Sequence, residues 1–349
     1  MTGSDAAKFL QGVITATALT RKNQNPRQDP FYAGFLNATG RVLYDVFVYP
    51  DPKGNIVKGA RSDAGGFLIE VDADQALDLC KYIKRYKLRA DVQVWQLQHG
   101  EGMIWQAWGV TDISEPDVPS GIVYRDPRAP DLGYRIFQPG YEPPERLLDL
   151  GLAKEHDYTV RRYLSGVPEG QNEILKEVAL PQESNMDFMG AIDWRKGCYI
   201  GQELTIRTKH RGVVRKRILP CVIYDEHAAP PETLHYEPEG TGTGGDGVTG
   251  VRAHEVPQST SIGRCGKSGR TAGKWLAGAG NIGLGLCRIE TMTGVQLPGE
   301  TAAAPVQGDE QFKLEWAGDD SDTQTSVRVK AFVPDWIQAG LDGVKPPQE

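Results

Sequence analysis

The spacing of apolar and polar residues predicts a chain in which helices and strands are mixed. Helices are predicted where apolar residues recur every three or four positions, in SDAAKFLQGVI with Ser4 as N-cap, in DQALDLCKYIKRYKL, and in LAKEHDYTVRRYLSGVPEG, which Gly166 and Pro168 end. Strands are predicted in FYAGFLNATGRVLYDVFVYP (two strands around a turn at 37–40), GGFLIEVDA, ADVQVWQLQ, MIWQAWGV, GYRIFQP and VVRKRILPCVIY. This mixed order indicates an α+β fold.

The last third of the chain differs in composition from the part before it. Residues from about 225 to 260 are rich in Gly, Pro, Glu and Thr, which predicts a mobile insertion that buries no core. The short runs GNIGLGLCRIE, FKLEWAG and SVRVKAFVPDW follow, and they predict a small antiparallel β domain at the C-terminal end. The stretch ISEPDVPS at 113–120 is typical of a linker.

Length, charge and cysteine content narrow the function classes. A chain of 349 residues predicts two or three domains. The net charge of −7 argues against a general nucleic-acid binder, and no apolar run is long enough to span a membrane. Five cysteines without a CxxC pair suit a reducing compartment. The chain starts almost inside a helix, so we expect that a transit peptide has been removed.

Two kinds of site find little support in the sequence. GRCGKSGRTAGKW at 263–275 is similar to a phosphate-binding loop, but the required spacing needs a glycine where Ser261 or Ser268 stands. We therefore expect these glycines in a hairpin or a loop. The six histidines form no HxxxH pair that would suggest a metal site. His210 lies twelve residues beyond Cys198, which makes only a weak case for a Cys–His nucleophile pair.

Cys198 has the most informative surroundings of the five cysteines, in DWRKGCYIGQELTIRTKHRG at 193–212. Helical spacing from Ile200 onward places the cysteine just before the first turn of a helix that Gly212 ends. The positive end of that helix, together with the Arg-Lys pair before the cysteine, is expected to favour the thiolate. The alternative is a small, buried apolar residue.

The stretch KGCYIGQE at 196–203 matches the signature of the YgfZ-like, folate-binding iron–sulfur maturation proteins, which share the fold of the glycine-cleavage T-protein, an aminomethyltransferase. The chain resembles the mitochondrial branch of that family over about residues 4–224, in DAAKFLQG, FLNATGRVLYDVFVYP, RYLSGVPEG, LPQESNMDFM and GQELTIRTKHRGVVRKR. The resemblance implies an α+β ring of three domains, at 1–50 plus 113–212, at 51–112, and at 213–349. It also implies late assembly of 4Fe–4S clusters in the mitochondrial matrix, alongside A-type cluster carriers.

The resemblance also gives the lone thiol a role. An iron–sulfur cluster usually needs four protein ligands, so one thiolate cannot hold it alone. We therefore expect Cys198 to be a metal ligand that is shared at a partner interface, with the other ligands from an A-type carrier or from glutathione. The residues of the signature that are expected to support it are Lys196, Gly197, Tyr199, Gly201, Gln202 and Glu203.

A tetrahydrofolate site is a further implication of the resemblance. Glu183 in LPQESNMD matches a family position that faces the pterin, whose edge suits a bidentate carboxylate. Asn185, Arg207 and Asp45 are expected to contribute, although Asn185 could instead cap a turn and Asp45 could pair within the sheet. Tyr44 stands where the T-protein has the first of two adjacent acids, which argues against aminomethyl transfer.

The sequence therefore predicts a non-catalytic iron–sulfur cluster assembly factor and no enzyme. One alternative is a folate-dependent aminomethyl or one-carbon transferase. Another is an accessory protein of RNA modification, since the basic run RTKHRGVVRKR at 207–217 could contact RNA, a polyglutamate tail or an acidic partner. The same run could equally be a solvated surface. We expect no membrane partner, and the acidic net charge makes RNA the least favoured ligand.

Overall fold

The computed structural model describes residues 1–349 apart from 53, 55–64, 114–116, 119–120, 242–249, 267–268, 298–309, 318–323 and 344–349. The chain divides into two compact units. Unit 1 contains Met1–Lys154, Ile174–Pro181 and Met189–Ile206, and unit 2 contains Glu155–Glu173, Gln182–Phe188 and Arg207–Glu349. The three domain ranges expected from the sequence stay a prediction.

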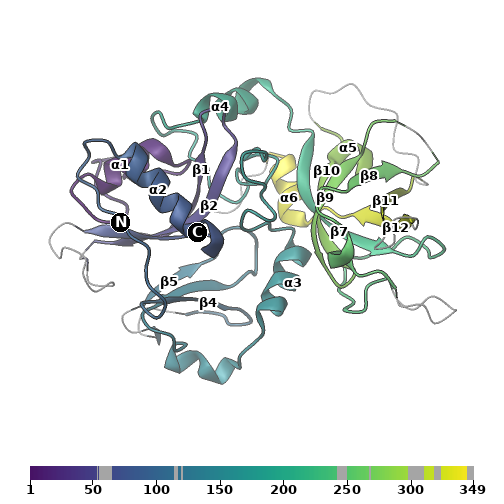
Figure 1. The fold of residues 1–349 in the computed structure, drawn as a ribbon, viewed down its shortest axis with the longest axis horizontal. Helices are drawn as coiled ribbons and strands as arrows, with labels where there is room; N and C mark the ends of the chain where they lie inside the picture. Colours follow the sequence, from purple (N-terminus) through teal and green to yellow (C-terminus); the bar gives the residue numbers. More distant parts are fainter. Residues whose placement is uncertain are drawn as a thin grey trace. The chain divides into compact units, whose positions relative to one another are not determined.

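An antiparallel sheet of three strands forms the first part of unit 1. Its order is β1 (Phe31–Leu36), β2 (Val42–Asp51) and β3 (Gly66–Glu70). Helices α1 (Ala6–Val13) and α2 (Ala76–Tyr86) lie along this sheet (Figure 1). Because side chains alternate between the two faces of a strand, one face of β1 and β2 supplies the core beneath the helices. That core includes Phe35, Tyr44, Val46 and Val48 of the strands and Leu10, Leu79 and Ile83 of the helices.

A second antiparallel sheet of unit 1 has the order β4–β6–β5, with bounds Met103–Ala107 for β4, Ile122–Arg125 for β5 and Tyr134–Gln138 for β6. A buried ionic network accompanies it. Asp126 accepts from Arg128 Nη2 at 2.7 Å, and both side chains are fully buried. Arg135 pairs with Glu70 of β3, and its guanidinium lies 4.2 Å from the ring centroid of Phe47 on β2. Charge-assisted contacts therefore join the two sheets of unit 1.

Unit 2 is built on a closed antiparallel barrel in the order β10–β7–β12–β11–β8–β9 (Figure 1). The bounds of its strands are Lys216–Tyr224 for β7, Ser261–Arg264 for β8, Gly273–Ala279 for β9, Ile282–Arg288 for β10, Phe312–Ala317 for β11 and Gln324–Ala331 for β12. Because the barrel is closed, each of these six strands pairs with two neighbours. The barrel interior is filled by apolar side chains that include Leu219, Ile223, Trp275, Leu314 and Val329.

Short helices complete both units. Unit 2 contains α3 (Glu155–Ser165), α5 (Ile289–Met292) and α6 (Asp335–Leu341), and α4 (Gln202–Arg211) follows the cysteine motif. Gly166 ends α3 as predicted, with a left-handed φ of +71°. The described part of the chain also contains short 3-10 helices in its connections, η1 (Ala73–Gln75), η3 (Glu145–Leu150) and η4 (Ala253–Glu255).

Most predicted strands and helices are confirmed, and three details are wrong. ADVQVWQLQ forms no strand; its only ladder contact is a single bridge between Gln93 and Thr2. Ser4 is not the N-cap of α1, because Asp5 takes that position and the Ser4 hydroxyl donates to Asp91 at 3.0 Å. The third detail concerns β7, which begins at Lys216 and not at Val213.

The expectation that residues 225–260 bury no core is wrong for the part of this segment that the structure describes. Ala253 and Val256 are buried in the barrel core, and Ala253 N–H donates to Gly280 O at 2.6 Å. A few apolar side chains are enough to anchor this segment, because the barrel provides an apolar surface against which they can be buried. Residues 242–249 of the insertion lie outside the described residues.

The interpretation of 113–120 as a linker is tested only in part. Ile113 and Val118 are buried in the core of the β4–β6–β5 sheet, so these two positions are anchored. Residues 114–116 and 119–120 lie outside the described residues. Of the hairpin or loop expected for the glycines of 263–275, the structure shows a hairpin, since β8 and β9 pair with each other, and Gly266 between them has a φ of +67°.

Candidate functional site

Cys198 lies on an irregular segment at residues 193–201, which we call the thiol loop. Among the five cysteines, all of which the structure describes, Cys198 alone is exposed. The alternative of a small buried residue is therefore excluded. The loop leads into α4, whose first residue is Gln202, so three residues separate the thiol from the helix. The expected position of Cys198 just before the first helical turn is therefore wrong, since α4 begins two residues later than the expected Ile200. The effect of the helix dipole on the thiol is correspondingly weaker, because that effect falls off within about one turn.

Two backbone carbonyls hold Lys196 against the body of unit 1. Its Nζ donates to Ile14 O at 2.7 Å and to Ala16 O at 2.6 Å. The same ammonium lies 5.0 Å from the ring centroid of Tyr199, within cation–π range. Burial lowers the pKa of Lys196 to about 7. The side chain thus fixes the thiol loop to the segment after α1.

The residues after the cysteine are anchored as well. Tyr199 is buried, and burial raises the pKa of its phenol to about 12. Its backbone N–H donates to Gln202 Oε1 at 3.2 Å, and Ile200 N–H donates to Gly12 O at 3.1 Å. Glu203 lies exposed in the first turn of α4. Cys198 is therefore an outward residue between two inward ones.

The two glycines of the signature have different surroundings. Gly201 has a left-handed φ of +80°, and a Cβ on it would lie 2.3 Å from Asn37 O. Gly40 of the β1–β2 turn packs against the same point, so the turn and the start of α4 meet through glycine. A Cβ on Gly197 would meet nothing within 4 Å. The close neighbour of Gly201 is therefore the chain itself, whereas Gly197 has open space beside it.

Asp193 fastens the beginning of the thiol loop. Its Oδ1 accepts from Arg21 Nη2 at 2.6 Å and from Arg195 N–H at 2.9 Å. Arg21 is more than half exposed, so this ion pair fixes geometry more than it adds stability. Arg195 is exposed beside the thiol. The loop consequently presents Cys198 from a frame held at Asp193, Lys196 and Tyr199.

The predicted folate residues Glu183 and Asn185 lie together on Gln182–Phe188 of unit 2, which we call the second loop. Glu183 pairs with Lys216 at 2.8 Å. Asn185 is fully buried with a φ of +60°; its Nδ2 donates to Ile218 O at 2.7 Å. Arg217 Nη1 donates to Asn185 Oδ1 at 3.3 Å. Both ends of the Asn185 amide are thus engaged by β7.

The other two predicted folate residues lie elsewhere in the chain. Asp45 is buried on β2 and accepts from the Tyr32 hydroxyl at 3.1 Å, which agrees with the alternative that it pairs within the sheet. Arg207 is exposed on α4. The neighbouring residue, Tyr44, is buried in the apolar core of unit 1, so the position where the T-protein has its first acid holds a buried phenol ring here.

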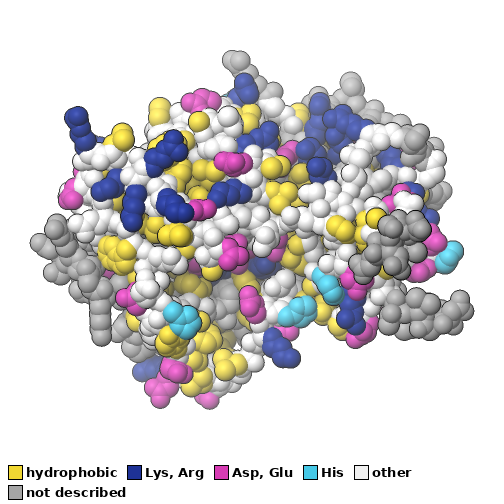
Figure 2. Space-filling model, in the orientation of Figure 1, with side chains coloured by type: hydrophobic (Ala, Val, Ile, Leu, Met, Phe, Trp, Pro, Cys, Tyr) yellow, Lys and Arg dark blue, Asp and Glu magenta, His cyan; other side chains and the backbone are white. Residues whose placement is uncertain are grey.

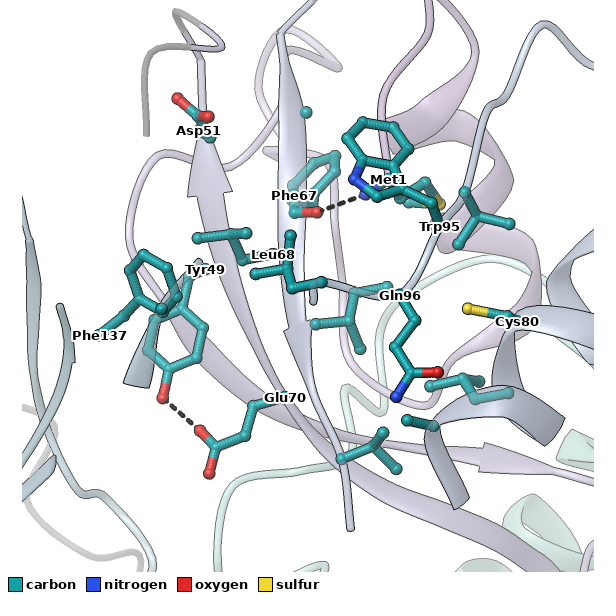
Figure 3. Close-up of a pocket in the computed structure, with 18 of the residues that line it drawn as sticks. Met1, Tyr49, Asp51, Phe67, Leu68, Glu70, Cys80, Trp95, Gln96 and Phe137 are labelled. Atoms are coloured by element: carbon teal, nitrogen blue, oxygen red, sulfur yellow. Dashed lines mark hydrogen bonds between the residues drawn. The ribbon is translucent and has the colours of Figure 1, made fainter. Parts of the chain in front are cut away.

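Sequence reasoning missed a cavity in unit 1 of about 340 Å³ (Figure 3). It lies along β3 and is mostly apolar, with Cys80 of α2, Trp95 and Phe137 in its wall. Its polar corner is formed where the Tyr49 hydroxyl donates to Glu70 at 2.6 Å. Burial raises the pKa of Tyr49. The lining residues come from distant segments of β2, β3, α2 and β4, so no sequence motif announces the cavity.

No group of three or more His, Cys, Asp or Glu residues that could hold a metal occurs in the part of the chain that the structure describes. Within the same residues, none of the helices has the length and apolar character needed to cross a membrane.

The chain is similar over nearly its full length to proteins that are named as iron–sulfur cluster assembly factors. The model of a family described as the C-terminal beta-barrel domain of CAF17 matches residues 215–339, which contain the barrel of unit 2. A relative from Pyricularia oryzae, named as a mitochondrial iron–sulfur cluster assembly factor IBA57 homolog, is 53% identical over 98% of this chain and 82% of its own. A relative of the same name from Chaetomium globosum is 48% identical over 98% of this chain and 81% of its own.

A solved structure shares the fold. The glycine cleavage system aminomethyltransferase T from Bartonella henselae superposes with a TM-score of 0.56, covering 97% of this chain and 82% of its own. The sequence identity is only 11%, so the likeness concerns the fold alone. It confirms the expected α+β fold of the aminomethyltransferase type, and the barrel confirms the antiparallel C-terminal domain.

Proposed function

The chain belongs to the family of mitochondrial iron–sulfur cluster assembly factors homologous to IBA57, and we propose that it lends the Cys198 thiolate to a cluster that it shares with a carrier protein. The cargo is a 4Fe–4S cluster on its way to a recipient protein in the mitochondrial matrix. The partner is an A-type carrier, and glutathione is the alternative source of the other ligands. The observation that carries the proposal is an exposed cysteine on a loop whose neighbouring side chains are anchored.

The ligand count supports sharing. A cluster usually takes four protein ligands, and the described residues offer no group of three that could bind metal. Thiolate sulfur is a soft ligand that suits cluster iron. A single exposed thiolate can therefore complete a cluster that another molecule already holds in part. The anchored frame keeps the sulfur in one place, so less conformational entropy is lost when such a complex forms.

The family membership identifies an assembly factor on a transferase fold. The rival function, aminomethyl transfer, receives no support from the site. Tyr44 lies in the apolar core where the T-protein has an acid, and Asp45 is buried with Tyr32 as its partner. We therefore do not propose catalysis by this chain.

Tetrahydrofolate stays a prediction of the resemblance. Its strongest residue is Glu183, whose carboxylate would have to exchange the ammonium of Lys216 for the pterin edge. Asn185 has both amide ends bound to β7 and offers little to a ligand. The cluster-sharing proposal does not depend on folate.

The test is to mix the protein with an A-type carrier, ferrous iron and sulfide, and to follow the visible absorbance of the complex in gel filtration. Cys198→Ser should remove the coloured heterocomplex, because a serine oxygen is a harder and poorer ligand for cluster iron. The free energy of unfolding should change by less than about 0.5 kcal/mol, since the side chain is exposed.

Cys80→Ser is the matched control, because it makes the same replacement at a half-buried thiol of unit 1. This variant should keep the coloured complex. A folded Cys198→Ser protein that still elutes as a coloured heterocomplex would show that the thiol is not a ligand. The signature would then serve as a docking surface only.

A further inference from the structure

Three arginines from separate segments meet at one end of the barrel of unit 2. Arg288 ends β10, and its backbone N–H donates to Ala272 O at 2.8 Å while its Nε donates to Thr271 O at 3.1 Å. These contacts hold it beside the segment that follows Arg270. The next residue of the chain donates to Arg215 O at 3.0 Å, just before β7. Arg215 and Arg270 are exposed, and Arg288 is half-buried.

The cluster carries a net positive charge. The pKa of Arg288 is lowered, first by burial and then by the positive charges of Arg270 and Arg215. Glu183 opposes this lowering of the Arg288 pKa as the smallest of the causes, and its carboxylate pairs with the ammonium of Lys216 at 2.8 Å. The nearby Glu290 accepts from a backbone N–H, that of Leu297, at 3.3 Å. Figure 2 shows Lys and Arg side chains gathered over this end of the barrel, beside α5.

We propose that Arg215, Arg270 and Arg288 form a docking surface for an acidic peptide segment of a protein partner. A guanidinium presents its donors as a planar fork that fits a carboxylate with two parallel hydrogen bonds. Arg215 and Arg270 are exposed and bring positive charge to the rim of the barrel, where it suits a run of Asp and Glu side chains. The sequence pattern could not group them, because one lies in the basic run at 207–217 and another in the glycine-rich hairpin at 263–275.

An acidic peptide fits this surface better than RNA does. A long polyanion meets the field of the whole chain, which carries a net charge of −7, and that field opposes its approach. A short acidic segment meets mainly the local cluster, because salt screens charges beyond about 8 Å. This inference rests on unit 2 alone and does not depend on the role of Cys198.

The test uses the full chain and a fluorescein-labelled hexaglutamate peptide as the probe, followed by fluorescence anisotropy at low and at physiological salt. Arg270→Glu and Arg215→Glu should each weaken binding roughly tenfold, since each replaces a charge-assisted contact by repulsion. Both side chains are exposed, so the thermal unfolding midpoint should stay close to that of the wild type. A higher salt concentration should weaken binding of the peptide to the wild type and reduce the difference in affinity between the wild type and the two variants.

Arg252→Glu is the control, because Arg252 is an exposed arginine of unit 2 that pairs with Glu239 at 2.9 Å, away from the cluster. This variant should bind hexaglutamate as the wild type does. Equal losses in the control and the cluster variants would overturn the proposal. Tighter binding of a single-stranded oligouridylate than of hexaglutamate would overturn it in favour of nucleic acid. The coloured complex with the carrier serves as a separate readout, so a failure here leaves the cluster-sharing proposal standing.

Discussion

The thiol loop of unit 1 and the second loop of unit 2 are both short, irregular segments that the sequence singled out as candidate sites, yet they treat their polar side chains in opposite ways. The thiol loop turns Lys196 and Tyr199 inward and leaves Cys198 exposed. The second loop turns Asn185 inward, and its Asp187 pairs with Arg217 of β7. A ligand can therefore reach Cys198 in the thiol loop without breaking a contact of the fold. In the second loop, Asn185 and Asp187 are already bound to β7.

The two loops also differ in what fixes them. Backbone carbonyls, a glycine contact and the Arg21–Asp193 ion pair fix the thiol loop, and Arg21 of that pair is more than half exposed. An ion pair fixes the second loop: Arg217 donates to both oxygens of Asp187 at 2.8 and 2.9 Å, and its guanidinium lies 3.7 Å from the Phe188 ring centroid. Breaking a buried ion pair leaves a charge without its partner, which is costly. The second loop should therefore be the more fragile of the two.

The largest effect is expected for Arg217→Met, which should destabilise the protein by about 3–5 kcal/mol. The substitution leaves Asp187, whose side chain is only 12% exposed, without its guanidinium partner, and it removes the donor that Arg217 gives to Gln182 O at 2.7 Å. Chemical denaturation followed by circular dichroism would measure the loss.

Lys216→Met is the matched control on the same strand, because Lys216 is about one third exposed and pairs with Glu183. It should cost less than about 1 kcal/mol. If the two variants are equally stable, the buried ion pair does not hold the second loop, and the contrast between the loops is lost.

Regular patterns in the sequence predicted the frame but not the direction of single side chains. The two runs of strand-forming residues in 31–51, on either side of the turn at 37–40, predicted β1 and β2, and both strands are buried along their whole length. The barrel strands β8 and β9 were expected only as a glycine-rich hairpin or loop. The glycines and arginines of 263–275 interrupt the alternation of apolar and polar residues that identifies a strand. Whether Lys196 faces solvent or the carbonyls of residues 14 and 16 depends on a contact across 180 residues, which spacing cannot reveal.

The next effect separates the two glycines of the thiol loop. Gly201→Ala should destabilise unit 1 by about 2–4 kcal/mol, since its φ of +80° is unfavourable for alanine and the new Cβ would lie 2.3 Å from Asn37 O. Gly197→Ala should change stability by less than about 0.5 kcal/mol, because a Cβ there meets nothing within 4 Å. Thermal unfolding of both variants measures the difference. Equal stability of the two would mean that the β1–β2 turn does not need its close contact with the start of α4.

The last effect concerns pH and the buried lysine of the thiol loop. Burial lowers the pKa of Lys196 to about 7 in the folded protein, whereas an unfolded lysine titrates near 10.4. Between these values the unfolded chain binds the proton and the folded chain releases it, so the free energy of unfolding should rise with pH from about 7 to about 10. The slope from this one group is at most about 1.4 kcal/mol per pH unit. Below pH 7 both states are protonated and the contribution is constant.

Lys196→Met isolates this contribution. When the free energy of unfolding of the variant is subtracted from that of the wild type at each pH, the groups that titrate alike in both proteins cancel. Relative to the wild type, the variant should lack the rise between pH 7 and 10, and denaturant unfolding at several pH values would show it. The variant also loses the donors to Ile14 O and Ala16 O, so the thiol loop should loosen and Cys198 should sample more positions. Amide hydrogen exchange at residues 193–201 should then quicken while the second loop stays protected. An unchanged pH profile with unchanged exchange would mean that Lys196 does not anchor the loop, and the rigid presentation of Cys198 would lose its physical basis.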